Sequence, residues 1–135
     1  MSGDVAATMR RLHGDGAFLV FRNTVPGHWD CTSRQFEGPV ERSFARALVA
    51  AAPAKYGWPM FRQNNLNVEG KWGSLSGFIA DGWKLLDAYT PTVLRADSHI
   101  GGSDCLHYCV PGPADHWATL LYNMLLADRD RRSAR

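Results

Sequence analysis

The sequence contains no long apolar run. No stretch of its 135 residues approaches the ~18 consecutive apolar residues that a membrane-spanning helix needs. The first sixteen residues, MSGDVAATMRRLHGDG, lack the apolar core of a secretory signal. A formal net charge of +2 is too small to indicate a nucleic-acid partner. Taken alone, these absences favour a water-soluble cytosolic protein without a membrane segment.

Internal repeats and low-complexity tracts are also missing, and the length suits one domain rather than two. With 45% hydrophobic and 21% charged residues, the composition is typical of a globular protein. The basic residues of the tail alternate with Asp128 and Asp130, which indicates a solvated helix end rather than an anion site; they are Arg129, Arg131, Arg132 and Arg135. We therefore expect one domain over 16–128, between an N-terminal segment, 1–15, of undetermined structure and a charged tail, 129–135.

Apolar patterning predicts two strands and two helices. The run GAFLVFRNT (16–24) predicts a buried strand from about residue 17 to about 22, and WKLLDAY (83–89) predicts a second. A helix is expected from Pro39 to about residue 52. Residues 53–73 and 90–103 are expected to be mostly loop. A second amphipathic helix is expected from Ala114, with apolar residues at helical spacing: Trp117, Leu120, Leu121, Met124 and Leu125.

The order strand, helix, strand, loop, helix predicts an α/β layer with parallel strands. Two strands are fewer than the about four to six of a typical open sheet. The predicted sheet is therefore incomplete.

The six residues DCLHYC (104–109) combine an acid, a histidine and two cysteines, and residue types alone leave three interpretations open. Cys105, His107 and Cys109 are zinc-ligand types, with Cys31 as a fourth, although the spacing is poor for a structural zinc site. The cysteines are alternatively disulfide partners or small buried thiols, and their odd count leaves one sulfur unpaired within the chain. If the stretch forms a helical turn, Asp104 and His107 share one face, and the carboxylate orients a histidine base.

Three blocks in order resemble the trichome birefringence-like proteins, members of the PC-esterase group of GDSL/SGNH acyl-esterases. The family pattern Asp-Cys-x-His-aromatic-Cys-Leu-Pro-Gly-x-x-Asp-x-Trp is matched within DCLHYCVPGPADHWATLLYNMLL (104–126), with Val110 in place of leucine. The block LLDAYTPTVLRADSHIGG (85–102) resembles the family's Leu-x-x-Arg-x-Asp-x-His segment. The block VFRNTVPGHWDC (20–31) resembles its Phe-Arg-Thr-x-x-Pro-x-His segment, which leads to a cysteine.

The resemblance implies the C-terminal portion of an SGNH-hydrolase-like domain, an α/β sandwich with a doubly wound parallel sheet. It implies O-acetyl transfer or acyl hydrolysis on glycans, typically polysaccharides in the Golgi or secretory-pathway lumen. It implies no cofactor, and an acetyl donor, acetyl-CoA among the candidates, as co-substrate. By the same carry-over, Asp104 and His107 are catalytic, while Cys31, Cys105 and Cys109 take part in disulfides of unassigned pairing.

The family's serine nucleophile lies in a Gly-Asp-Ser block that this sequence lacks. HGDGA (13–17) has glycine where the serine is needed and is interpreted as a turn. We therefore expect a C-terminal fragment, inactive alone, whose missing cysteine partner and serine lie upstream. The alternatives are a non-catalytic glycan-binding or interaction remnant of the same fold and, ranked below it, a small zinc-stabilised module.

Several further residues are secondary candidates. Trp58 or Trp72 is a candidate for stacking on a sugar ring, against a packing role. His116 is expected to be exposed to solvent and to have no functional role. The candidate substrate-binding residues, each with a structural alternative, are Arg22, His28, Asp97 and His99.

Overall fold

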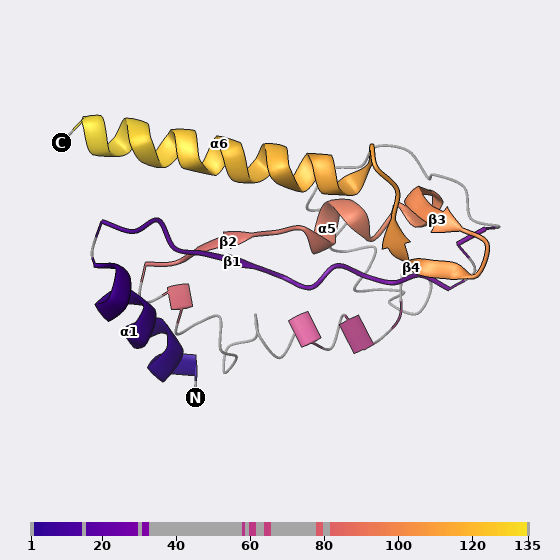
Figure 1. Ribbon diagram of the computed structural model, residues 1–135, viewed down its shortest axis with the longest axis horizontal. Coiled ribbons are helices and arrows are strands. Elements are labelled where there is room, and N and C mark those ends of the chain that lie inside the picture. Colours follow the sequence, from indigo (N-terminus) through magenta and orange to yellow (C-terminus); the bar gives the residue numbers. More distant parts are fainter. Residues whose placement is uncertain are drawn as a thin grey trace.

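A computed structural model describes residues 2–14, 16–29, 31–32, 58, 60–61, 64–65, 78–79 and 82–134. Its elements are a helix at the N-terminal end, a parallel strand pair, a β-hairpin and a long C-terminal helix (Figure 1). The helix predicted from Pro39, and most of the loop predicted at 53–73, lie outside the described residues.

The two predicted strands pair with each other in parallel. Strand β1 (Val20–Arg22) lies against β2 (Lys84–Leu86), with Phe21 opposite Leu85. The Lys84 amide donates to the Leu19 carbonyl at 2.9 Å, which extends the pairing by one residue. Both strands are shorter than expected, yet their parallel direction is what an α/β layer requires. The prediction of parallel strands is confirmed, and a complete sandwich is not seen within the described residues.

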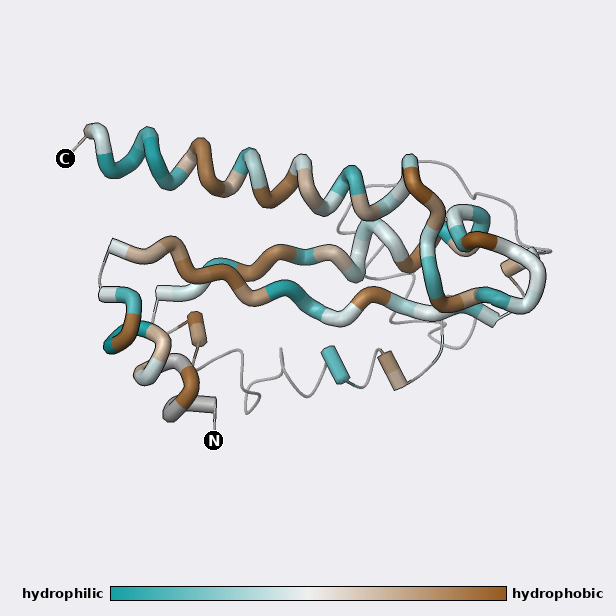
Figure 2. The backbone as a smooth tube through the Cα atoms, in the orientation of Figure 1, coloured by the Kyte–Doolittle hydropathy of each residue, from teal (hydrophilic) through white to brown (hydrophobic). Residues whose placement is uncertain are grey.

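Apolar side chains pack around this strand pair. Phe21 stacks on the buried Phe78 with ring centroids 5.6 Å apart, and Trp83 lies 4.9 Å from Phe78 by the same measure. Figure 2 shows the two strands as the most continuous hydrophobic part of the tube. The side chains of the two strands and of Phe78 therefore form a small apolar core.

The segment 90–103, expected to be loop, is largely structured. Helix α5 (Tyr89–Thr92) and the 3-10 turn η1 (Ala96–Ser98) lead into strand β3 (His99–Gly101). Strand β3 pairs in antiparallel fashion with β4 (Asp104–Tyr108), which places His99 opposite Tyr108. Gly101 and Gly102 have φ values of +91° and +65° in the turn, a region that glycine enters without a Cβ penalty. The prediction failed because consecutive elements of three to five residues are too short to show a period.

Helix α6 (Pro113–Ser133) begins one residue before the predicted start and includes most of the predicted charged tail. Asp115 Oδ2 accepts a hydrogen bond from the Gly112 amide at 2.7 Å, which caps the first turn. Arg131 and Arg132 in the last turn suit the negative end of the helix dipole. The helix lies along the strand pair (Figure 1), with Trp117 half-buried, whereas Tyr122 is 60% exposed.

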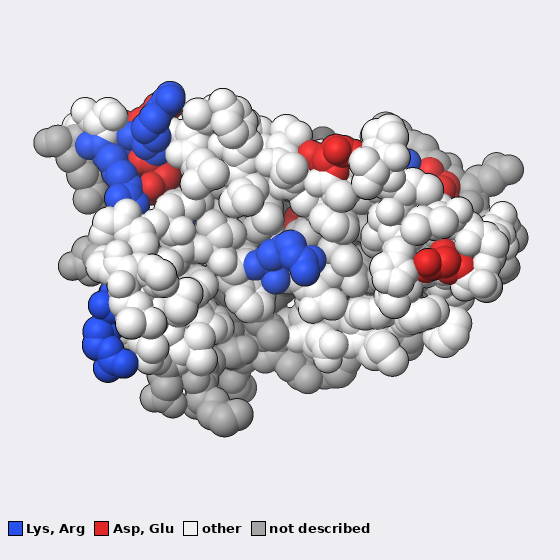
Figure 3. All heavy atoms as spheres, in the orientation of Figure 1, with Lys and Arg blue, Asp and Glu red and all other residues white. Residues whose placement is uncertain are grey.

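An N-terminal helix, α1 (Ser2–His13), was not predicted from the sequence. It lies at the opposite end of the strand pair from the hairpin (Figure 1). No described helix combines the length and apolar character needed to cross a membrane. On the face shown in Figure 3, the described acidic and basic side chains are dispersed and form no large patch of one sign.

Asn23 fastens β1 to the start of α5. Its side chain is 2% exposed, and its Oδ1 accepts hydrogen bonds from the Ala88 and Tyr89 amides at 2.8 and 2.9 Å. Its Nδ2 donates to Asp87 Oδ1 at 3.0 Å, and that oxygen also accepts from the Thr90 amide. These contacts hold the strand end and the helix start together before the chain reaches the hairpin.

Replacing Asn23 with alanine is expected to lower the free energy of unfolding by about 2 to 3 kcal/mol, because buried amide groups lose their acceptor. Urea denaturation of the purified chain measures the change. Asn123→Ala, at an exposed position of α6, is the matched control and is expected to change stability by less than about 0.5 kcal/mol. Equal effects of the two substitutions would contradict the role assigned to Asn23.

Candidate active site

Asp104 and His107 face each other on strand β4. His107 Nδ1 lies 2.9 Å from Asp104 Oδ2 and 3.2 Å from Oδ1. The His107 side chain is 70% exposed and that of Asp104 is 37% exposed, so the pair is open to solvent. An imidazole held by a carboxylate at one nitrogen and open at the other is the arrangement of a general base.

The contact does not arise from the helical turn on which the sequence hypothesis depended. Asp104 Oδ1 instead accepts hydrogen bonds from the backbone amides of Leu106, at 3.1 Å, and His107, at 2.9 Å. The carboxylate thus folds back over the following residues and meets the His107 ring from within a strand. The predicted contact between the two side chains is present, whereas the predicted helical turn is replaced by a strand.

These bonds fix the charge of Asp104. The His107 amide, then the His107 ring and then the Leu106 amide lower the pKa of the Asp104 carboxyl to about 2. Asp104 is therefore ionised across the ordinary pH range. An ionised carboxylate favours the tautomer with its proton on His107 Nδ1, which leaves Nε2 able to accept a proton.

Asp104 is expected to titrate with a midpoint near pH 2, well below the ordinary value of 3.8. Because the folded pKa is depressed, the stabilisation from this contact is present above the unfolded pKa and is lost as pH falls through the folded one. The side-chain carboxyl ¹³C signal of Asp104, followed by NMR, measures the midpoint. His107→Ala is expected to raise it only partly, since the backbone amides remain, and an ordinary midpoint in the unaltered chain would contradict this account.

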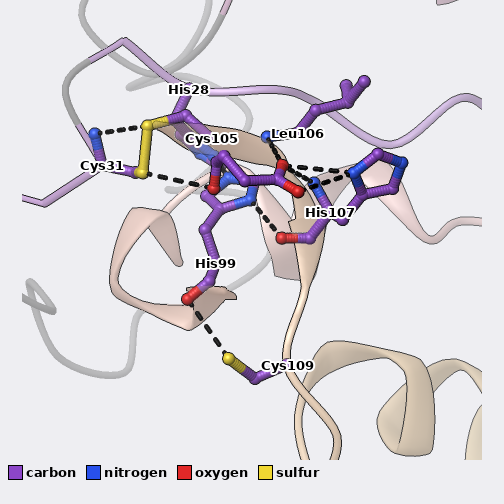
Figure 4. Close-up of a disulfide and its surroundings, with 8 residues drawn as sticks. His28, Cys31, His99, Cys105, Leu106, His107 and Cys109 are labelled. Atoms are coloured by element: carbon purple, nitrogen blue, oxygen red, sulfur yellow. Dashed lines mark hydrogen bonds and ion pairs between the residues drawn. A yellow bond between two sulfur atoms is a disulfide. The ribbon is translucent and has the colours of Figure 1, made fainter. Parts of the chain in front are cut away.

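A disulfide joins the strand that carries the pair to a distant loop. Cys31 and Cys105 are bonded across a sequence separation of 74 residues. The His28 amide also donates to the Cys105 carbonyl at 3.0 Å, next to the disulfide drawn in Figure 4. Two sulfurs of the suggested zinc set are thereby occupied, and the described residues contain no cluster of three or more metal-ligand types. Cys109 is an exposed free thiol, so a disulfide at Cys109 stays a prediction.

His28 and His99, predicted to bind substrate, are buried behind the Asp104–His107 pair. They are 1% and 5% exposed, and their facing ring nitrogens lie 2.7 Å apart. His99 Nδ1 also contacts the His107 carbonyl at 2.9 Å. In this structure both rings make internal contacts, which favours a structural role over direct substrate contact.

Asp97 and Arg22, the other two secondary candidates, contact different partners. Asp97 accepts two hydrogen bonds of 2.9 Å from Arg95, a bidentate ion pair at the surface. Arg22 is exposed at the end of β1, where its guanidinium carbon lies 5.9 Å from the centre of the Trp117 ring, within cation–π range. The structure therefore places Arg22 beside the N-terminal part of α6, and substrate binding by either residue stays a prediction.

Three supporting residues were missed by sequence reasoning. Tyr108 stacks on His99 with ring centroids 4.2 Å apart and donates its hydroxyl proton to the Pro26 carbonyl. Burial raises the pKa of Tyr108, so its phenol stays protonated and able to donate. The other two are Asn23 and Asp87, and the only sequence signal for them was a polar residue directly after each apolar strand.

Comparison with known proteins supports the resemblance seen in the sequence. Residues 79–124 match the PC-Esterase family, described as a GDSL/SGNH-like Acyl-Esterase family found in Pmr5 and Cas1p. Protein trichome birefringence-like 42 of Arabidopsis thaliana is 40% identical over 62 residues, which cover 40% of this chain and 17% of that protein. Protein trichome birefringence-like 26 of the same plant is 28% identical over 130 residues, covering 84% of this chain and 29% of that protein.

A third relative has an activity in its name. Xyloglucan O-acetyltransferase 1 of Arabidopsis thaliana is 34% identical over 58 residues, which cover 31% of this chain and 14% of that protein. The chain thus spans less than a third of the length of these relatives. No solved structure matches the chain. The matched family segment contains the Asp104–His107 pair, the hairpin and the first half of α6.

Proposed function

We propose, on the premise that this chain is a member of the PC-esterase family, that it supplies the acid–base half of a serine-dependent acyl-transfer site. The reaction is O-acetyl transfer to, or acyl hydrolysis on, a polysaccharide. The observation that carries the proposal is the 2.9 Å contact between Asp104 Oδ2 and the exposed His107 ring. A non-catalytic remnant has no need to keep an ionised carboxylate on an open imidazole.

In the complete site, His107 Nε2 removes the proton of a serine hydroxyl as the serine attacks the acetyl donor. Asp104 holds the Nδ1 proton and stabilises the imidazolium that forms. His107 then protonates the leaving group, which yields an acetyl-serine. In the second half, the same nitrogen deprotonates a glycan hydroxyl or a water molecule, which takes the acetyl group and frees the serine.

The serine itself comes from outside this sequence, which lacks a Gly-Asp-Ser block. Within the described residues, Ser98 is buried at 7% exposure. The absence of a nucleophile elbow from the sequence favours a C-terminal part of a larger catalytic domain.

The secretory pathway is the proposed location. The Cys31–Cys105 disulfide favours an oxidising lumen over the reducing cytosol, and this outweighs the cytosolic expectation drawn from the lack of a signal sequence. Within this pathway, the Golgi lumen is the compartment that the family resemblance implies. The acetyl donor, acetyl-CoA among the candidates, is a co-substrate, and no cofactor enters the steps above.

A graft tests the function. Residues 20–133 of this chain, which contain both Cys31 and Cys105, replace the corresponding C-terminal segment of Xyloglucan O-acetyltransferase 1. Acetyl transfer to xyloglucan oligosaccharides is then measured by mass spectrometry. We expect the graft to form acetylated product, because the segment restores a base beside the host's serine.

The 135-residue chain alone is expected to give no acetyl-enzyme, since it lacks the serine block. A graft that folds, secretes and binds xyloglucan but transfers no acetyl group would overturn the proposal. That outcome would favour the alternative of a glycan-binding remnant.

A further inference from the structure

Two buried histidines form a hydrogen-bonded row behind the candidate active site. His28 Nε2 lies 2.8 Å from the Val93 carbonyl oxygen, and His28 Nδ1 lies 2.7 Å from His99 Nε2. His99 Nδ1 lies 2.9 Å from the His107 carbonyl oxygen. The row thus begins at a carbonyl after α5 and ends at the backbone of the candidate base, as Figure 4 shows for His28, His99 and His107.

The contacts of this row need more protons than two neutral imidazole rings carry. A carbonyl oxygen only accepts, so His28 Nε2 and His99 Nδ1 must each carry a proton. A neutral imidazole has one proton, which leaves His28 Nδ1 and His99 Nε2 as two facing lone pairs. A nitrogen–nitrogen distance of 2.7 Å requires a proton between them. The three contacts therefore need three protons on four nitrogens, one more than two neutral rings supply.

We propose that His28 and His99 are positioning residues that share one extra proton, and that this charged pair holds the backbone of His107 in place for catalysis. Only the role in catalysis rests on the proposed function. The shared proton and its contact with the His107 carbonyl are properties of the chain itself.

The pair reaches the active-site strand at three places. The His99 ring donates to the His107 carbonyl and stacks on Tyr108, and the His28 amide donates to the Cys105 carbonyl at 3.0 Å. His28 also lies edge-on to Tyr108, at a centroid distance of 6.5 Å. The two histidines therefore hold the backbone carbonyls of Cys105 and His107, on either side of Leu106. The side chains of Asp104 and His107 stay open to solvent.

The charged groups around the pair act in both directions. Burial lowers the pKa of His99, while the His107 carbonyl and the carboxylates of Asp104 and Asp97 oppose that shift, and the His107 ring adds to it. The neighbouring Tyr108 phenol stays neutral. Because the net direction is downward, the shared proton leaves at a lower pH than it would leave an ordinary histidine. One of the three contacts of the row is then left without a proton.

Histidine ¹⁵N NMR of the full 135-residue chain tests the proton count. The ring nitrogens of His28 and His99 are followed from about pH 5 to about pH 8, a range that spans ordinary histidine titration. Below the transition we expect three protonated nitrogens between the two rings, with a shared N–H···N signal. Two rings with one proton each throughout this range, or with two each at its acidic end, would overturn the shared proton.

Substitution tests the positioning of His107. His99→Phe keeps an aromatic ring on Tyr108 but removes both hydrogen bonds, and His116→Phe at an exposed position of α6 is the matched control. We expect the carbonyl ¹³C signal of His107 to move upfield in His99→Phe, to stay in place in His116→Phe and to return partly in His99→Gln, whose amide can still donate. An unmoved His107 carbonyl signal in His99→Phe would overturn the positioning role.

Failure of the proposed function can be distinguished from failure of the histidine pair. The NMR titration of the unaltered chain requires neither folding of a variant nor an active graft, so it decides the proton count in every case. Loss of acetyl transfer in the graft with an intact three-proton signal would contradict the proposed function and leave the pair standing. Transfer that survives His99→Phe in the graft at an unchanged kcat and pH profile would contradict the positioning role alone.

Discussion

Replacing His107 with alanine in the grafted acetyltransferase is expected to lower kcat by about 10⁴-fold or more, with a small change in KM. Removal of the base from a serine–histidine–acid site leaves only the catalysis due to binding and oxyanion stabilisation. The His107 side chain is 70% exposed and bonds to Asp104 at the surface, so the fold should survive the change. Initial rates of acetyl transfer to xyloglucan oligosaccharides measure the effect.

His116→Ala is the matched control for this loss. His116 is exposed in the first turn of α6, nine residues further along the chain. Its removal is expected to change kcat by less than about threefold, as for a surface substitution remote from the chemistry. Similar losses in the two variants would mean that transfer does not depend on the Asp104–His107 pair.

Replacing both Cys31 and Cys105 with alanine is expected to lower the free energy of unfolding by about 4 kcal/mol. The bond closes a loop with a sequence separation of 74 residues, and opening it restores chain entropy to the unfolded state. The corresponding fall in melting temperature is about 10 °C or more for a chain of this size. Calorimetry or thermal circular dichroism measures the change.

Cys109→Ala provides the control, because it removes an exposed free thiol and leaves the bond intact. It is expected to change stability by less than about 0.5 kcal/mol. A loss at Cys109 as large as that of the double variant would indicate that Cys109 takes part in the stabilising cross-link, contrary to the pairing observed.

Sequence reasoning worked where a residue pattern covers a local element. The long helix α6 was predicted to within a residue at its start, because its apolar spacing continues over several turns. The strands around Phe21 and Leu85 were predicted from short apolar runs, and their parallel pairing followed from the order of elements. Asp104 and His107 were identified because a family pattern surrounds them, whereas their spacing alone fitted several chemistries.

The rest depended on contacts between distant residues. The pairing of Cys31 with Cys105, rather than with Cys109, is set by the approach of two loops that have no shared sequence pattern. Burial of His28 against His99 brings together residues 71 positions apart, so neither could be recognised as the other's partner. The hairpin was missed because strands of three to five residues leave too few positions for alternation to show.

The contacts of the active-site strand form over very different lengths of chain, which has a consequence for how the protein folds. Asp104 finds both backbone donors and its imidazole within three residues, and hairpins form in about 1–10 μs. The bridge from Cys31 spans 74 residues and needs an oxidant, with formation times of seconds to hours. A newly made chain therefore forms the Asp104–His107 contact early and the Cys31–Cys105 bond late. Formation of the disulfide, rather than of the Asp104–His107 contact, is therefore the slow step that fixes the hairpin against the chain around His28 and Cys31.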